Sequence, residues 1–223
     1  MGALTLDERH TVVREEYEQE GGRNTRLVTI TGMVRGKPDV AAVEAALDGL
    51  MDAVSADVPV YISLRPGRRV RVRREGFSRE VHGGQRTGAY TINLRAEEGW
   101  EESETVTTVG WNIDASGATI ALENGGTLPT FPLVSLDALG SIEGLALSDG
   151  TRTLSYEGEV EAGATLIVDG VAGQVWLDDL DITPYTRGDF PQLAPGETVL
   201  TYTDALGSSH LLDGEVTYRD RWW

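Results

Sequence analysis

The chain has 223 residues, of which 40 % are hydrophobic and 25 % charged, and its formal net charge is −17. This composition is typical of a folded protein with one large or two smaller domains, and it excludes a disordered chain. The acidic balance argues against general nucleic-acid binding, and the absence of cysteine excludes disulfides, zinc–thiolate sites and cysteine nucleophiles.

No run of about 18 apolar residues is present, so no transmembrane helix is expected. Basic residues are concentrated in the first half, since only four of the nineteen Lys and Arg residues follow Ser103. The charged stretch Glu97–Glu104 separates this half from a region of short β-prone runs divided by Gly, Pro and Asp. We therefore predict two domains, residues 1–103 and 104–223.

The first predicted domain begins with strand-like segments. Residues 1–20 mix charged and apolar side chains and are compatible with an exposed or partner-dependent strand, and Arg26–Val34 is rich in β-branched residues. Pro38 and Asp39 then begin the only predicted helix, because Pro favours the first helical position and Asp the positive end of the helix dipole. From Val40 to Val54, apolar residues recur at steps of three or four, which predicts a helix packed on a sheet.

Arginine and valine alternate after this helix, so that Arg69, Arg71 and Arg73 share one face of a predicted strand. Three interpretations of this face remain open: a solvated surface, contact with another subunit, and binding of phosphate or nucleic acid. Strands are also predicted at Val58–Leu64, Phe77–Val81 and Thr87–Ala96, the last two as a hairpin.

About nine short strands are predicted for the second domain, which is typical of an antiparallel β-sandwich or jelly roll. In Thr198–Thr203, Leu200 and Tyr202 share one face, and the preceding Pro195-Gly196 suits a type II turn with positive φ at Gly. Glu215–Trp223 is predicted as the return strand of a hairpin. The predicted fold class is therefore mainly β with one helix, an α+β domain followed by a β-sandwich.

Motifs for catalysis and phosphate binding are incomplete. Residues 140–144 place Ser141 one position too early for a nucleophile elbow, and Gly36-Lys37 is followed by Pro38 where a phosphate loop needs Ser or Thr. The three histidines are far apart, and the acidic loop from Asp178 to Asp189 lacks the spacing of known calcium loops. No enzymatic activity, cofactor or metal site is expected.

Aromatic residues in the second domain are candidates for a sugar-stacking platform, although alternation along strands favours burial in a core or interface for some of them. They are Trp111, Trp176, Tyr185, Trp222 and Trp223.

Several short segments, spread over nearly the whole chain, together match the layout of a known protein family. In the first half they are Arg26–Gly32, the Ala-rich helix through Leu47 and Leu50, Arg69–Phe77 and Tyr90–Arg95. In the second half the most specific positions are Gly188, Asp189, Phe190, Pro191, Pro195, Gly196, Tyr218, Arg219, Asp220, Arg221 and Trp222. With this layout the chain resembles the distal tail proteins of long-tailed phages, whose N-terminal domain forms a ring and whose C-terminal domain is a galectin-like β-sandwich.

The resemblance implies a structural virion protein, made in the host cytoplasm and located in the virion tail. Such proteins form a hexameric ring, a baseplate hub that joins the tail tube protein to baseplate or tail-tip proteins, and DNA passes through it. The resemblance thus implies a homo-oligomer, with no membrane and with DNA only in transit. Closure of a ring requires two different faces of each subunit to meet. We expect those faces to include Arg69, Arg71 and Arg73 on one side and Glu15, Glu16 and Glu18 on the other.

Two alternatives remain. One is a carbohydrate-binding module that recognises a host-surface glycan through the C-terminal sandwich. The other is a tail tube or terminator protein, which would usually lack a separate acidic sandwich of this size.

Overall fold

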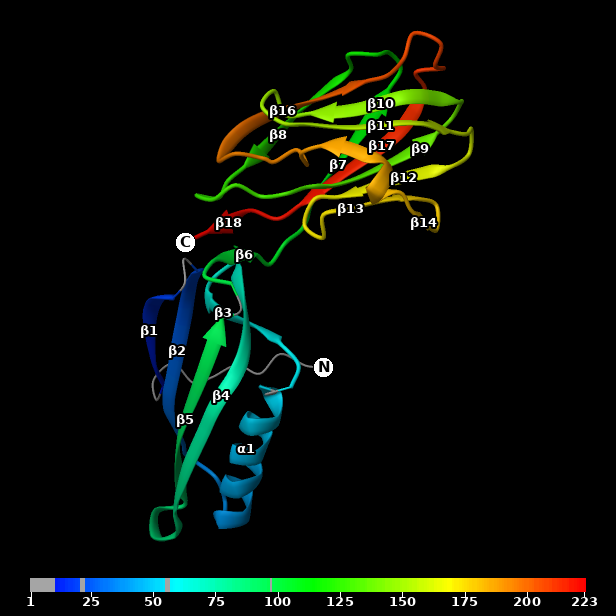
Figure 1. The fold of residues 1–223 in the computed structure, drawn as a ribbon. Helices are drawn as coiled ribbons and strands as arrows, with labels where there is room; N and C mark the ends of the chain where they lie inside the picture. Colours follow the sequence, from blue (N-terminus) through cyan, green and yellow to red (C-terminus); the bar gives the residue numbers. More distant parts are fainter. Residues whose placement is uncertain (1–10, 21–22, 55–56, 97) are drawn as a thin grey trace. The chain divides into compact units, whose positions relative to one another are not determined.

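The computed structural model describes residues 11–20, 23–54, 57–96 and 98–223. The chain divides into two compact units between Glu101 and Glu102, and Figure 1 shows the elements of both. The predicted fold class is confirmed, because the described residues form antiparallel sheets and one α-helix. A short strand, β6 (Glu101–Ser103), spans the division.

Five antiparallel strands build the sheet of the N-terminal unit. They are β1 (Thr11–Glu20), β2 (Arg23–Val34), β3 (Val60–Arg65), β4 (Arg68–His82) and β5 (Thr87–Ala96). Their order is β1-β2-β5-β4, with β3 paired to β4. The strand expected within residues 1–20 is confirmed from Thr11 onward, and residues 1–10 lie outside the described part. Strand β1 is therefore separated from β4 by two strands of the same sheet.

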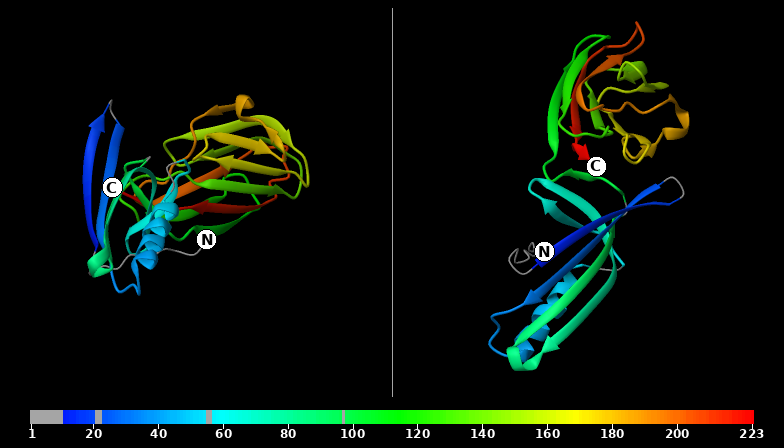
Figure 2. Two further views of the ribbon diagram at one scale, coloured as in Figure 1. Left: turned by 90° about the horizontal axis from the view of Figure 1, so that it is seen from below. Right: turned by 90° about the vertical axis from the view of Figure 1, so that its left-hand side faces the viewer.

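Helix α1 (Val40–Ala53) covers one face of this sheet (Figure 2). Its buried side chains are Val43, Leu47 and Leu50, as the apolar stripe predicts. They pack against inward-facing residues of the sheet, namely Val28, Ile30, Val70, Val72, Ile92 and Leu94. The approach of the helix requires Gly88, because a Cβ there would lie 2.8 Å from side-chain atoms of both Val43 and Leu47.

The helix begins at Val40, two positions after Pro38, the predicted first helical residue. Asp39 has an extended backbone and is the N-cap, and its carboxylate accepts a hydrogen bond from the backbone N–H of Ala42 at 2.8 Å. Pro38 consequently precedes the cap. The side chain of Asp39 satisfies a backbone donor that the helix itself leaves without a partner.

Replacing Asp39 with alanine is expected to destabilise the N-terminal unit by about 1 kcal/mol, because this capping bond is lost. The far-ultraviolet helix signal during thermal unfolding measures the effect, since α1 is the only α-helix among the described residues. Asp39→Asn keeps a capping oxygen and is expected to be nearly neutral. Equal losses in both variants would show that the cap is not the cause.

Strand β4 is continuous from Arg68 to His82, whereas the sequence predicted a break near Gly76. The pairing register with β5 shifts between Arg74 and Gly76, so a β-bulge absorbs the irregular position within one strand. The predicted hairpin between β4 and β5 is confirmed, with Val81 opposite Gly88.

Two antiparallel sheets form the C-terminal unit. The five-stranded sheet has the order β15-β11-β10-β16-β8. Its members are β8 (Thr119–Asn124), β10 (Ile142–Ser148), β11 (Thr153–Val160), β15 (Thr186–Gly188) and β16 (Gly196–Thr203). The six-stranded sheet has the order β14-β13-β12-β9-β17-β7. Its members are β7 (Thr107–Ile113), β9 (Leu133–Ala138), β12 (Thr165–Asp169), β13 (Gln174–Leu177), β14 (Leu180–Asp181) and β17 (Leu212–Tyr218). Beyond them lies β18 (Arg221–Trp222).

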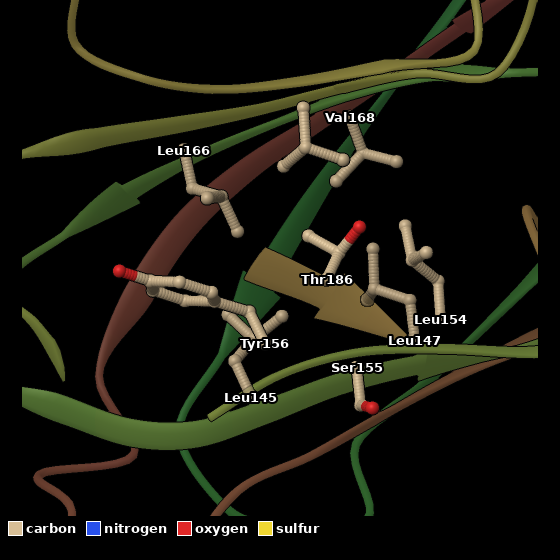
Figure 3. Close-up of a pocket in the computed structure, with 9 residues that line it drawn as sticks. Leu145, Leu147, Leu154, Ser155, Tyr156, Leu166, Val168 and Thr186 are labelled. Atoms are coloured by element: carbon tan, nitrogen blue, oxygen red, sulfur yellow. The ribbon is translucent and has the colours of Figure 1, made fainter. Parts of the chain in front are cut away.

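The two sheets pack face to face around one apolar core. Leu200 and Tyr202 are fully buried in it, in agreement with their predicted common face. Figure 3 shows side chains of β10, β11, β12 and β15 around a small void between the sheets, which measures about 10 Å³. Because one water molecule needs about this volume, this void has no room for an organic ligand.

Strands β16 and β17 do not form the predicted hairpin. Strand β16 pairs with β8 and β10, whereas β17 pairs with β7 and β9 in the other sheet. The loop of residues 204–211 therefore crosses between the sheets. The predicted return strand also ends earlier, at Tyr218, before the separate strand β18. Alternation specifies which face a side chain occupies but not which strand becomes the neighbour.

Candidate assembly surfaces

The arginine face of β4 points away from the core. Arg71 and Arg73 are exposed and Arg69 is half-buried, whereas Val70 and Val72 between them are buried. The guanidinium carbon of Arg69 lies 3.9 Å from the ring centroid of Tyr61, which is consistent with a cation–π contact. The surface therefore combines several positive charges with an aromatic side chain, a composition suited to an acidic protein partner.

The acidic residues of β1 are divided between the two faces of the sheet. Glu16 forms an exposed ion pair with Arg14 at 2.6 Å, whereas Glu15 is largely buried and contacts Arg26. The side chain of Glu18 lies outside the described part of the chain. Glu15 and Glu16, both expected near the subunit interface, therefore lie on different faces, because successive residues of a strand point to opposite faces. Strand β1 also exposes Val12, Val13 and Tyr17.

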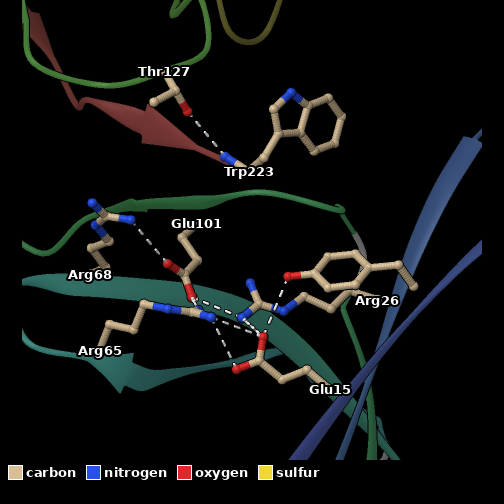
Figure 4. A network of polar contacts seen from close by, with 8 residues as sticks. Glu15, Arg26, Arg65, Arg68, Glu101, Thr127 and Trp223 are labelled. Atoms are coloured by element: carbon tan, nitrogen blue, oxygen red, sulfur yellow. Dashed lines mark hydrogen bonds and ion pairs between the residues drawn. The ribbon is translucent and has the colours of Figure 1, made fainter.

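A buried charge network lies below these surfaces, and Figure 4 shows its members. Arg26 is fully buried and donates from Nη2 to Glu101 at 2.8 Å and also to Glu15. Glu101 is almost fully buried and also contacts Arg65, with Arg68 at 3.7 Å. One carboxylate thus balances three arginines that come from β2, from the end of β3 and from the start of β4.

The network favours the charged form of Arg65. Desolvation works against the charged form of Arg65, but the carboxylates of Glu101 and Glu15 outweigh it and raise the pKa of Arg65. The Arg26 guanidinium carbon also lies 5.5 Å from the ring centroid of Tyr17. Sequence reasoning missed this cluster. Arg26 lies two residues before Val28 and four before Ile30, so it shares their core-facing side of β2, and this spacing is the signal that could have found it.

The C-terminal motif positions lie in segments that close the sandwich. Gly188 ends β15 with φ +92, and the next backbone N–H, of Asp189, donates to the carbonyl of Thr153 at 3.0 Å. Pro191 is buried, and Phe190 packs against the core. Gly196 follows Pro195 with φ +86, the positive φ that the type II turn requires.

The last motif residues bind the loop that follows β8. The Tyr218 hydroxyl donates to the carbonyl of Glu123 at 2.8 Å, and the Asp220 carboxylate accepts from the backbone N–H of Gly125 at 3.1 Å. The Arg221 carbonyl accepts from the N–H groups of residues 127 and 128. Trp222 is half-buried and Arg219 donates to the carbonyl of Ser103 at 2.8 Å. These contacts give the C-terminal motif a structural role.

Aromatic residues do not gather into one platform. Trp111 is buried in the core, Trp176 and Trp222 are half-buried, and Tyr185 and Trp223 are exposed. An open groove of about 400 Å³ lies elsewhere on the sandwich, beside Arg152, Glu197 and Thr201, and no aromatic residue lines it.

Asp149 lines this groove. Burial disfavours its charged form, but hydrogen bonds from the backbone N–H groups of Arg152, Gln192 and Thr151 and from the Arg152 side chain outweigh burial and lower the pKa of Asp149. The acidic loop weighed as a calcium site is likewise engaged: Asp178 accepts from the N–H of residue 165 and Asp181 from that of residue 183. Within the described ranges, no three His, Asp or Glu side chains converge as metal ligands.

Residues 125–222 match the family described as the C-terminal domain of siphovirus-type tail components. The match covers most of the C-terminal unit and does not extend into the N-terminal unit. The matched range includes every C-terminal motif position from Gly188 to Trp222. No curated protein matches the chain in sequence.

The fold of this chain is similar to the solved structure of Dit from phage SPP1, which is described as a paradigm of the hub adsorption apparatus in phages that infect Gram-positive bacteria. The TM-score is 0.68 at 15 % sequence identity, over 95 % of this chain and 89 % of that chain. The whole chain thus shares the fold of that protein, and its C-terminal unit matches the tail-component domain. No helix in the described part of the chain is long and apolar enough to cross a membrane.

Proposed function

We propose that this protein is a phage tail component, a ring-forming distal tail hub: a hexamer that connects the tail tube protein to the baseplate or tail-tip proteins and lets DNA pass through its centre. Its family domain is the observation that carries the proposal. The whole-chain fold supports a hub over a tube or terminator protein, since the second unit is a complete sandwich with its own core. In this role the chain acts by assembly, without a catalytic step.

The N-terminal sheet has two unlike borders that suit a heterologous ring interface. Strand β1 lies at one end with exposed Glu16, Val12 and Tyr17, and the arginine face of β4 lies towards the other end. Contact between the β1 border of one copy and the arginine face of the next would repeat around a ring, because the two surfaces differ and need not be self-complementary. Opposite charges would steer and orient the contact.

Charge is divided between the units in a way that suits DNA transit. Residues 102–223 contain twenty acidic and four basic residues, whereas residues 1–101 contain sixteen acidic and fifteen basic residues. The acidic excess thus belongs to the sandwich, and the nearly balanced unit is the one proposed to form the ring. A ring built from a unit with almost no net charge would not hold DNA by general attraction to its phosphates, and the acidic sandwich would repel them.

Charge reversal at Arg71 is expected to weaken the ring by about tenfold or more per contact, because a glutamate would face the acidic border of the next copy. Light scattering across a salt series measures the mass of the assembly. Arg187→Glu makes the same charge change on the exposed surface of the sandwich and is expected to leave the mass unchanged.

The swap Arg71→Glu with Glu16→Arg is expected to restore assembly, because it returns opposite charges to the two borders. Undiminished assembly of the single variant would show that this face is not at the interface. A wild-type chain that is monomeric at every salt concentration would contradict self-assembly and favour a stand-alone carbohydrate-binding module, with the groove beside Glu197 as its first candidate site.

A further inference from the structure

A buried hydrogen-bond network joins the two ends of the loop that crosses between the two sheets of the sandwich. The Asp204 carboxylate is fully buried, and the Tyr202 hydroxyl donates to it at 2.7 Å. His210 Nδ1 lies 2.7 Å from both carboxylate oxygens, and about 28 % of the histidine side chain is exposed. The two ends of the loop of residues 204–211 are thus joined through one carboxylate and one imidazole.

His210 is held in an unusual backbone conformation. Its φ is +59, in the left-handed region that non-glycine residues seldom occupy. Such a conformation costs free energy and persists only where other contacts impose it. The bond to Asp204 is the side-chain contact of His210 that can impose it.

Backbone hydrogen bonds also join the loop to the residues beside it. The backbone N–H groups of Ala205 and Ser209 donate to the carbonyls of Glu143 and Ser141 at 2.8 and 2.9 Å. Between them Leu206 is fully exposed. The loop therefore displays an apolar side chain to solvent from a segment fixed at both ends.

We propose that the contact between His210 and the buried Asp204 is a proton-dependent latch, which orders the loop of residues 204–211 when His210 is protonated and loosens it when His210 is neutral. Histidine is the side chain whose charge ordinarily changes between pH 5 and 8. A protonated imidazole neutralises the buried carboxylate, and the charged hydrogen bond is stronger than one from a neutral ring.

The titratable groups near the loop do not compete with His210 for the contact with Asp204. Burial, and then the nearby Asp204 carboxylate, raise the pKa of Tyr202, so its hydroxyl stays protonated and keeps donating. On the segments packed against the loop, Asp114 and Glu143 have exposed side chains. Within the described part of the chain, His210 is the only cationic group paired with Asp204.

Amide hydrogen exchange of the full chain, corrected for the intrinsic pH dependence of exchange, tests the latch. Protection of the Ala205 and Ser209 amides is expected to fall roughly fivefold to tenfold between pH 5.5 and 8, while amides of β12 keep their protection. In His210→Asn, whose side chain tolerates positive φ and carries no charge, protection of the two loop amides is expected to be low and independent of pH.

His82→Asn is the matched control, because His82 lies in the other unit and its removal is expected to leave the profile of the loop unchanged. Asp204→Asn retains an acceptor for Tyr202 but removes the buried charge, and it is expected to abolish the pH dependence as His210→Asn does. A flat wild-type profile would overturn the proposal without any variant. An identical slope in wild type and His210→Asn would overturn it as well.

Discussion

Replacement of Gly188 by alanine is expected to destabilise the C-terminal sandwich by roughly 3–5 kcal/mol, among the largest effects of a single substitution. A Cβ at this position would lie 2.0 Å from the carbonyl oxygen of Thr153, and φ of +92 is strained for any L side chain. The clash also displaces the acceptor of the Asp189 N–H. Tryptophan fluorescence during denaturant unfolding measures the loss, since four of the five tryptophans lie beyond Glu101.

Gly150 provides the matched control for backbone strain. It has φ +85, and a Cβ there would meet no atom within 4 Å. Gly150→Ala is therefore expected to cost only about 1 kcal/mol, and the difference between the two variants isolates the clash with Thr153. Equal losses at the two glycines would contradict the close approach at Gly188. The helix signal of the N-terminal unit is expected to be unchanged in both variants.

Replacement of Glu101 by glutamine is expected to destabilise the N-terminal unit by about 3–5 kcal/mol. The change is isosteric, but it removes the buried carboxylate that contacts Arg26, Arg65 and Arg68. Arg26 has no exposed surface and would keep only Glu15 as a charged partner. Thermal unfolding followed by the helix signal measures the effect, because α1 packs on the same sheet.

The double variant Arg26→Met with Glu101→Gln distinguishes the cost of an uncompensated buried charge from the cost of altered packing. It removes the buried cation together with the buried anion, so it is expected to be more stable than Glu101→Gln alone. Glu16→Gln is the control for an exposed glutamate on β1 and is expected to change stability by less than about 1 kcal/mol. If the double variant were the less stable of the two, an uncompensated charge would not be the cause.

Local patterns in the sequence predicted much of the fold. The stripe from Val40 to Val54 identified α1, and alternation assigned Arg71 and Val72 to opposite faces of β4. Both are properties of neighbouring residues, because helical and extended backbones repeat over a few positions. The break predicted at Gly76 was wrong, since a bulge needs the partner strand before it can be recognised.

The candidate surfaces were predicted less completely. The arginine face was found because alternation exposes it, whereas Glu15 and Glu16 proved to point to opposite faces of β1. The bond between Asp204 and His210 escaped detection because no spacing rule connects two ends of a loop that crosses between sheets.

By itself, the sequence determined the mainly β class, the single helix, the inward and outward faces of the strands, and the C-terminal motif positions that fall in the matched domain. Tertiary structure alone decided that β16 and β17 join different sheets and that Glu101 lies among three arginines. The physical reason is range: backbone periodicity acts over a few residues, whereas strand pairing and burial of charge depend on which distant segments give the lowest free energy when the whole chain packs.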